Sequence, residues 1–116
     1  MPRLQRLRAL AFHDQHGRCF YCRQPMWLRS PAELGIPWRL AAPLQCTAEH
    51  LVARKDGGRD TRENIVAACR QCNQGRHRRK AEMTPGKFGQ FVRQRQKQGR
   101  WWSVVLAGWI ETLSAK

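Results

Sequence analysis

The chain has 116 residues and a formal net charge of +14, from 22 lysines and arginines against 8 aspartates and glutamates. This length is typical of one small domain with a modest apolar core, which a bound metal would help to stabilise. No apolar run is long enough to span a membrane, and arginines interrupt the apolar residues near the N-terminus, so we expect no secretion signal and a cytoplasmic protein. The positive charge is spread along the chain and predicts a polyanionic partner such as nucleic acid, although a ribosome-like or membrane-surface protein is the alternative.

Periodicity and turn residues predict helices at both ends of the chain and two short strands between them. The first helix carries Leu4, Leu7 and Ala11 on one face and is expected to end at Gly17. Strands are expected at residues 46–51 and 64–69, with Asp56-Gly57-Gly58 as a turn between them. Further helices are expected at residues 71–81, from Thr84-Pro85 onward, and at 101–113.

Residues 25–45 form a proline-punctuated stretch that predicts an insertion loop packed on the domain. Ser30 and Glu33 have the spacing of a capping box that starts one short helical turn. We expect Trp27 and Trp38 to anchor this loop by packing, in preference to contacting DNA.

The last predicted helix carries more apolar surface than a basic chain should leave in water. Its expected stripe is Trp102, Val105, Trp109 and Leu113, widened by Leu106 and Ile110. The stripe either caps the small core or docks on a second copy or a protein partner. We favour the core, because a domain of this size is short of apolar burial.

Four of the five cysteines form two pairs in which two residues separate the thiols: Cys19 with Cys22, and Cys69 with Cys72. Two such knuckles can complete a closed tetrahedral zinc site, and the alternatives are two disulfides or a redox pair. Cys46 has no partner in this arrangement and is expected to be a buried thiol. His13 and His16 lie near Cys19, but we expect them to be solvated residues at a helix end.

A polar motif follows in a characteristic order. It consists of Ala48-Glu49-His50-Leu51-Val52, then Gly57-Gly58, then Asn64-Ile65-Val66-Ala67-Ala68-Cys69-Arg70-Gln71-Cys72-Asn73. In these residues the sequence closely resembles the HNH endonucleases, over about residues 18–80 with the insertion outside the likeness. The resemblance implies an α+β fold: a ββα-metal finger with a four-cysteine zinc site and flanking N- and C-terminal helices.

Hydrolysis of a phosphodiester needs a deprotonated water, neutralised phosphoryl charge and a stabilised leaving oxygen. A histidine, with a reference pKa near 6.5, suits the first task, and a hard cation held by oxygen ligands suits the other two. The resemblance assigns the general base to His50 and the catalytic ion to Glu49 and Asn73. It makes Asn64 the amide that ties the histidine loop to the second strand. His77, one helical turn after Asn73, is either a further ligand or a phosphate contact.

The motif departs from the commonest family pattern at four positions. Glu49 stands where aspartate is commoner, and Asn73 where many members have histidine. An amide oxygen is a harder ligand than imidazole, so the site favours Mg²⁺ or Mn²⁺. Ala53 replaces a frequent proline and Arg76 a frequent lysine.

The basic segment after this motif is expected to lie along the DNA backbone and to position the duplex without reading its sequence. Its candidate phosphate contacts are Arg76, Arg78, Arg79 and Lys80.

Together these features predict one HNH nuclease domain over residues 1–116. Its parts are a zinc-bound core at 17–81, which contains the insertion at 25–45, and a helical extension at 84–116. We expect metal-dependent cleavage of DNA, in a restriction, phage or mobile-element setting, without a small-molecule cofactor or a membrane. The alternatives are a non-catalytic zinc-finger DNA-binding protein and a basic RNA-associated protein, neither of which needs the Glu49-His50 pair.

Overall fold

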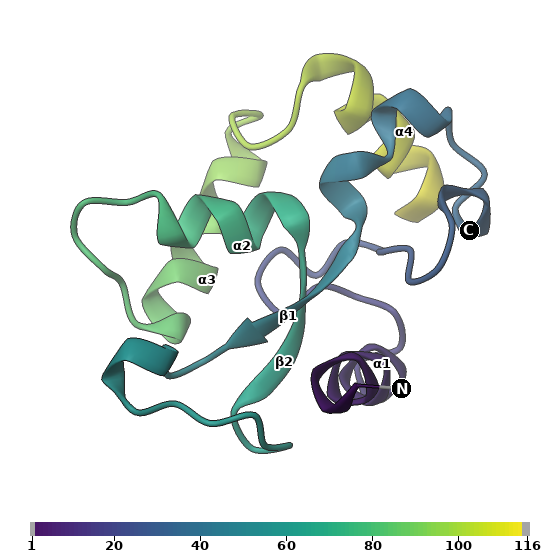
Figure 1. Cartoon of the computed structure of the whole chain (residues 1–116). Coiled ribbons are helices and arrows are strands. Elements are labelled where there is room, and N and C mark those ends of the chain that lie inside the picture. The colour runs from purple at the N-terminus through teal and green to yellow at the C-terminus, as the bar shows by residue number, and fades with distance from the viewer. Residues whose placement is uncertain (1, 115–116) are drawn as a thin grey trace.

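The computed structural model describes residues 2–114 and shows four α-helices and one two-stranded antiparallel sheet (Figure 1). The elements in chain order are α1 (Arg3–Asp14), β1 (Cys46–His50), β2 (Ile65–Cys69), α2 (Arg70–His77), α3 (Pro85–Lys97) and α4 (Val104–Ser114). The expected α+β class is therefore confirmed. No described helix is both long and apolar enough to cross a lipid bilayer.

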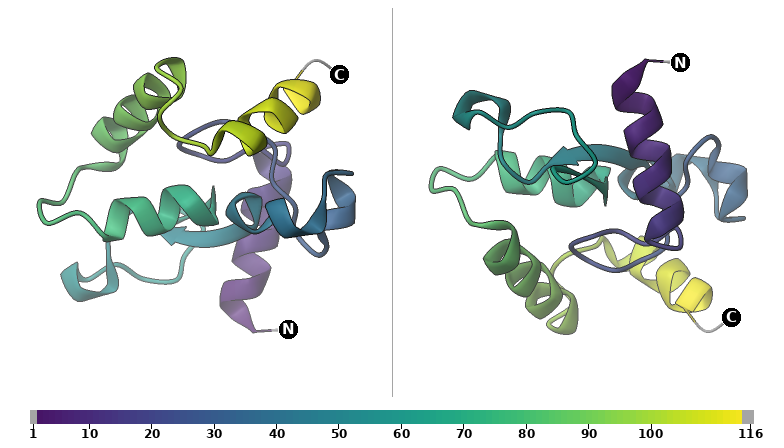
Figure 2. Two further views of the ribbon diagram at one scale, coloured as in Figure 1. Left: turned by 90° about the horizontal axis from the view of Figure 1, so that it is seen from above. Right: turned by 90° about the horizontal axis from the view of Figure 1, so that it is seen from below.

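The sheet brings the two halves of the polar motif together. β1 and β2 pair in antiparallel register from Cys46 opposite Cys69 to His50 opposite Ile65. α2 begins at the residue after β2 and folds back over the sheet, while α1 lies on the opposite side (Figures 1 and 2). The order β1, β2, α2 places the end of β1 beside α2.

α1 packs through Leu7 and ends before Gly17, which has a φ of +73°, as the sequence predicts. The side chain of Gln15 then meets the free edge of β2. Its amide nitrogen donates to the Ala67 carbonyl at 2.9 Å, and its amide oxygen accepts from the Ala67 N–H at 2.9 Å. The first bond adds to the one that the Ala67 carbonyl accepts from the Phe20 N–H, and the second satisfies an N–H that this edge of the strand would otherwise leave open.

The insertion is built from three short 3₁₀ turns, and the predicted capping box at Ser30 and Glu33 is present. Trp27 anchors it as expected, because its indole N–H donates to the Ala41 carbonyl at 2.8 Å. Trp38 does not, since it is 80% exposed. The chain around Trp38 instead buries the smaller Ala41 fully, so the expectation that Trp38 is an anchor is wrong.

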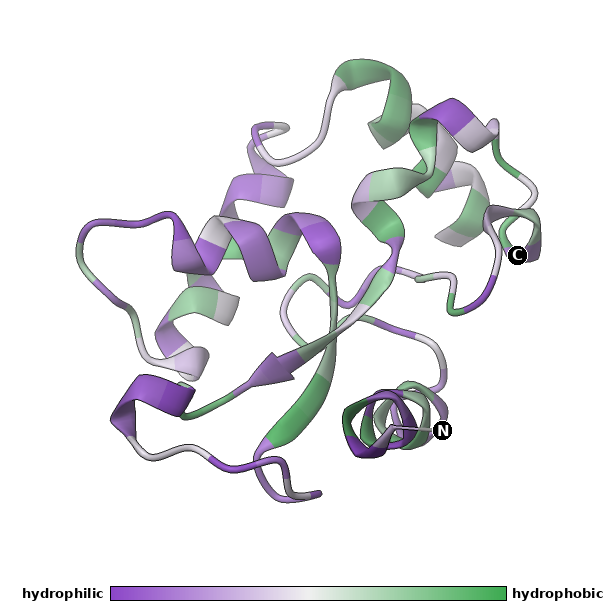
Figure 3. Cartoon of the chain, in the orientation of Figure 1, coloured by the Kyte–Doolittle hydropathy of each residue, from purple (hydrophilic) through white to green (hydrophobic). Residues whose placement is uncertain are grey.

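α4 and the insertion share an apolar cluster of Ile36, Ala41, Leu44, Leu106 and Ile110. The C-terminal segment therefore does cover core surface. The expected stripe is confirmed only in part: Leu106 and Ile110 are buried in this cluster and Trp102 and Leu113 pack against it, whereas Val105 and Trp109 are exposed. The start of α4 consists of hydrophobic residues (Figure 3). Trp102 lies before the first residue of α4, so its position does not determine which side of the helix faces the core.

Candidate active site and cysteine cluster

Four buried cysteines meet where the knuckle after α1 reaches the junction of β2 and α2. The sulfurs of Cys19, Cys22, Cys69 and Cys72 all lie within 4.8 Å of one another. Cys22 Sγ and Cys69 Sγ are 3.9 Å apart, close to the separation of about 3.8 Å expected around a tetrahedral ion with Zn–S bonds of about 2.3 Å. The cluster therefore has the size and the donor set of a structural metal site.

Backbone amides support this cluster. The N–H groups of Tyr21 and Cys69 each donate to Cys19 Sγ at 3.3 Å, and the Cys72 N–H donates to Cys69 Sγ at 3.4 Å. Hydrogen bonds of this kind stabilise a thiolate more than a thiol. Hydrogen bonds from the other cysteines and from the Cys69 N–H lower the pKa of the Cys19 thiol, whereas burial raises the pKa of the Cys69 and Cys72 thiols.

The other cysteine and the nearby histidines lie outside this cluster. Cys46 is fully buried opposite Cys69 in the sheet, and burial raises the pKa of its thiol to about 12. It therefore remains protonated at neutral pH, as a buried thiol should. His13 and His16 are exposed at the end of α1 and are not part of the four-residue cluster.

Glu49 is the one buried charged residue in the described chain, with 2% of its surface exposed. Its Oε1 faces His77 Nε2 at 3.0 Å. Its Oε2 accepts from the Tyr21 hydroxyl at 2.8 Å and from the Arg76 guanidinium at 3.0 Å. A buried carboxylate needs such partners, because an isolated charge is costly away from water.

Tyr21 links the cysteine cluster to this carboxylate. It sits between Cys19 and Cys22 in the first knuckle, so the backbone that wraps the sulfurs also aims its hydroxyl. Burial, with the nearby Glu49 charge, raises the pKa of the phenol far above its ordinary value. Tyr21 therefore stays protonated and acts as a hydrogen-bond donor to Glu49.

Arg76 does not lie on the surface with the other basic residues of its segment. Its side chain is 11% exposed, and its guanidinium donates to Glu49, to the carbonyl of His50 at 3.2 Å and to that of Leu51 at 3.3 Å. These bonds fasten α2 to the end of β1. Arg76 is therefore an internal partner of Glu49. The sequence had predicted an exposed phosphate contact at this position.

His50 ends β1 and is held by a carboxylate from the following loop. Its Nε2 lies 2.8 Å from Asp60 Oδ1, and Arg54 pairs with the other oxygen of Asp60 at 3.1 Å. The hydrogen bond to His50, together with the Arg54 charge, holds the pKa of Asp60 below its usual range. Asp60 is thus an anion beside the imidazole at neutral pH.

Asn64 closes the loop that carries His50. Its amide oxygen accepts from the Val52 N–H at 2.8 Å, and its amide nitrogen donates to the Val52 and Arg59 carbonyls at 3.0 Å. Gly58 packs inside this loop, where a Cβ would collide with the Val52 carbonyl. The Asn64 amide and Gly58 together set the shape of the loop. The amide is needed for its hydrogen bonds, and the glycine because a side chain would not fit.

Asn73 and His77 lie one turn apart on α2, beside the end of β1. The Asn73 amide nitrogen donates to Thr47 Oγ1 at 3.0 Å and to the Ala48 carbonyl at 3.3 Å. No residue between 2 and 114 donates to its Oδ1, so that oxygen is available as a ligand. Asn73 borders one open groove of about 480 Å³, and His77 borders another of about 320 Å³. Both side chains are therefore reachable from solvent.

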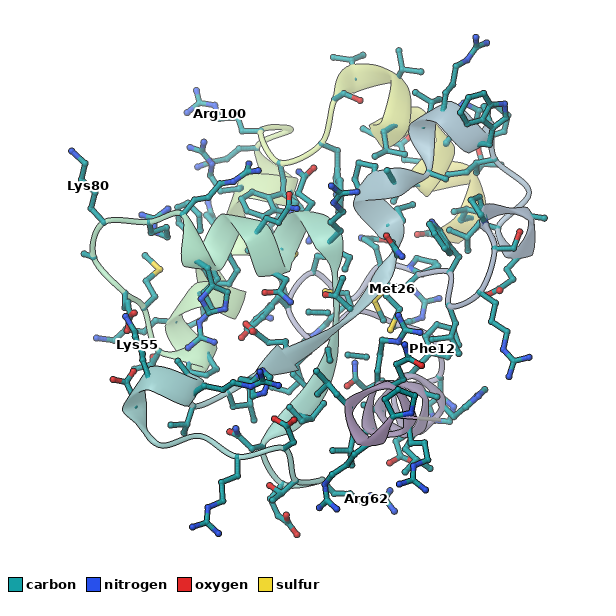
Figure 4. All side chains as sticks on the ribbon, in the orientation of Figure 1. Phe12, Met26, Lys55, Arg62, Lys80 and Arg100 are labelled. Carbon is teal, nitrogen blue, oxygen red and sulfur yellow. The ribbon has the colours of Figure 1, made fainter. Side chains whose placement is uncertain are left out.

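The remaining basic residues of the segment follow α2, because the helix ends at His77 and not near residue 81 as predicted. Arg78, Arg79 and Lys80 are exposed. Lys80 points away from the body of the protein (Figure 4). The guanidinium of Arg79 lies 4.4 Å from the centroid of the Phe91 ring, which holds this arginine against α3.

A protein-family model described as HNH endonuclease matches residues 19–79, more than half of the chain. The chain belongs to the HNH endonuclease family. The match covers both cysteine pairs, the end of β1 and all of α2, which is the region just described. No curated protein and no solved structure matches the chain.

Two residues of this HNH site were not anticipated from the sequence. Tyr21 could have been suspected from its place inside a metal knuckle, where the backbone is rigid. Asp60 follows the Gly57-Gly58 turn by two residues, and nothing in its spacing distinguishes it from Asp56. Only the course of the loop between β1 and β2 brings it to His50.

Proposed function

We propose that this HNH protein is a metal-dependent endonuclease that hydrolyses DNA phosphodiester bonds with His50 as its general base. One observation carries the proposal: two histidines flank the end of β1, each paired with a carboxylate. His50 contacts Asp60, and His77 contacts the buried Glu49. A binding protein has no need of this arrangement, whereas phosphodiester hydrolysis needs both a base and a cation site.

The base is prepared by its hydrogen bond. When His50 Nε2 donates to Asp60, the neutral imidazole keeps a lone pair on Nδ1. Nδ1 can then accept a proton from a water that attacks phosphorus. Asp60 fixes the tautomer and stabilises the imidazolium that forms, as a carboxylate beside a catalytic histidine does.

The catalytic ion would be held by Glu49 and His77, with Asn73 one turn away. Glu49 Oε1 and His77 Nε2 are 3.0 Å apart, and neighbouring ligands of an octahedral ion with bonds of about 2.1 Å are separated by about the same distance. Bound there, Mg²⁺ or Mn²⁺ would neutralise phosphoryl charge and the leaving oxygen. The four-cysteine cluster would hold a separate structural Zn²⁺.

The direct test is cleavage of supercoiled plasmid by the purified chain with Mg²⁺ or Mn²⁺, with and without EDTA. We expect nicked or linear product that EDTA abolishes. DNA binding without cleavage would favour the non-catalytic zinc-finger alternative. Preferential binding or cleavage of RNA would favour the RNA-associated alternative.

Variants of the three candidate ligands should change the metal requirement. Glu49→Gln keeps an acceptor for Tyr21 and Arg76 but removes the charge, so we expect it to raise the Mn²⁺ concentration for half-maximal cleavage by at least about tenfold, or to abolish cleavage. Asn73→Ala and His77→Ala should raise it as well if they bind the ion. Zinc content, measured in parallel, should not change. If His77→Ala alters only DNA affinity, His77 is a phosphate contact and not a ligand.

Asp60→Asn should lower the rate of cleavage while leaving DNA affinity unchanged. The amide keeps the size of the side chain but removes the anion that orients and stabilises His50. We expect kcat to fall by about 10- to 100-fold with little change in KM. Asp56→Asn, in the same loop, is the matched control and should cleave at the wild-type rate. Equal rates for the two variants would remove Asp60 from the mechanism.

A further inference from the structure

A groove lined by four arginines runs along α2 and has a volume of about 510 Å³. The arginines are Arg70, Arg78, Arg95 and Arg100. The first two belong to α2 and its C-cap, Arg95 to α3, and Arg100 to the turn after α3. Figure 4 shows Arg100 on the side of α2 that faces away from β1. The groove thus joins the HNH motif to the extension beyond residue 79.

No acidic residue lines this groove. Among residues 2–114, its four guanidinium groups form no ion pair, whereas Arg54, Arg62 and Arg76 each pair with a carboxylate elsewhere. Positive charges that share an open groove without counter-ions repel one another. An anionic ligand in the groove would relieve this repulsion.

Arg95 is held in position before any ligand binds. Its guanidinium carbon lies 5.6 Å from the centroid of the Phe91 ring, against which Arg79 also stacks. The Phe91 ring in turn packs edge-to-face on Trp101, a further residue of the groove wall. An arginine ordered in this way loses less side-chain entropy on binding than a free one.

The spread of charge fits a polymer better than a single phosphate group. Arg70 and Arg78 are eight residues apart along α2 and its cap, or about 12 Å at 1.5 Å per helical residue. One strand of duplex DNA presents one negative charge per about 3.4 Å of the helix axis, so about three to four charges of a strand fall within that length. A single phosphate group could reach only one end.

The groove also continues to Asn73, a candidate ligand of the catalytic ion. A second groove, of about 480 Å³, shares Arg70 and Gln74 with the first and is lined by Arg8 and Asn73. We propose that the two grooves form one track for the phosphate backbone of duplex DNA, and that Arg95 and Arg100 of the extension guide the duplex toward Asn73. This inference deepens the proposed function, on which it rests for the identity of the ligand.

The test compares two double variants that lose the same charge. Arg95→Gln/Arg100→Gln removes the two positive charges that the C-terminal extension contributes to the groove. Arg29→Gln/Arg39→Gln removes two exposed arginines of the insertion that line neither groove. Affinity for a labelled 20-base-pair duplex is measured by fluorescence anisotropy across a salt series without added Mg²⁺ or Mn²⁺, so that no cleavage occurs and the cysteine cluster keeps its metal. Circular dichroism checks that both variants fold.

We expect the groove variant to bind at least about tenfold more weakly near 0.1 M salt. Its slope of log affinity against log salt should fall by about 1.8, for two lost phosphate contacts. The insertion variant should keep the wild-type slope. Equal slopes in the two variants, or a loss confined to single-stranded DNA of the same length, would overturn the inference.

Plasmid cleavage separates this result from the proposed function. A wild-type chain that never cleaves, but whose groove variant selectively loses duplex affinity, would refute the nuclease and retain the track. A wild-type chain that cleaves, with no difference between the two double variants, would refute the track alone.

Discussion

Substitution of His50 by alanine will leave the chain folded and able to bind DNA, and will slow plasmid cleavage by at least about a hundredfold. The reason is that a positioned base contributes about 10² to 10⁴ to the rate of a proton-transfer reaction. The side chain can be removed without collapse because Asp60 keeps its pairing with Arg54. The measurement is the nicking rate under single-turnover conditions with saturating Mn²⁺.

His13→Ala is the matched control for this variant. His13 is an exposed histidine of α1, away from the end of β1. The His13→Ala variant should cleave at the wild-type rate. A loss of cleavage in His50→Ala can then not be assigned to the removal of a histidine in general. Wild-type nicking by His50→Ala would refute the assignment of the base.

Replacing any one of Cys19, Cys22, Cys69 or Cys72 with serine will unfold or aggregate the protein and release its zinc. A structural zinc contributes about 10–16 kcal/mol of apparent binding free energy at pH 7, which exceeds or equals the usual stability of a small domain. The loss will extend to the candidate active site, because Tyr21 in the first knuckle donates to Glu49. Zinc per chain and the far-ultraviolet circular dichroism spectrum, each measured before and after chelation, check this expectation.

Cys46→Ala is the control for the cysteine series. Cys46 is as buried as the cluster cysteines but lies outside the cluster. The alanine variant should keep one zinc per chain and lose only the modest stability expected from a small change in a packed core. A metal-free wild-type chain with a native spectrum would contradict the structural role of zinc.

The four-cysteine site, the Gly-Gly turn and the order of the motif could all be predicted from the sequence. In each case the determinant is local. Two residues between thiols suffice to point both sulfurs at one ion. Gly57, with a φ of +93°, accepts a backbone conformation that other residues avoid. Thr84 caps α3 through its own hydroxyl, which accepts from the Lys87 N–H.

The details of the candidate site depended on elements far apart in the chain. The partner of His50 is set by the path of the loop between the strands, and the partners of Glu49 come from the first knuckle and from α2. Spacing along the sequence does not encode such contacts, because they arise only when separate elements pack.

The sequence by itself determined the family, the cysteines of the candidate metal site and the residue types of the HNH motif, since these follow from local spacing and local backbone geometry. Tertiary structure decided which basic residues face the solvent. Arg76 was expected at the surface but lies inside, because the buried carboxylate of Glu49 requires a cation beside it. Tertiary structure also decided that Arg95 and Arg100 meet α2 in one groove. The packing of α3 on the core brings them there, and no feature of the sequence pattern predicts it.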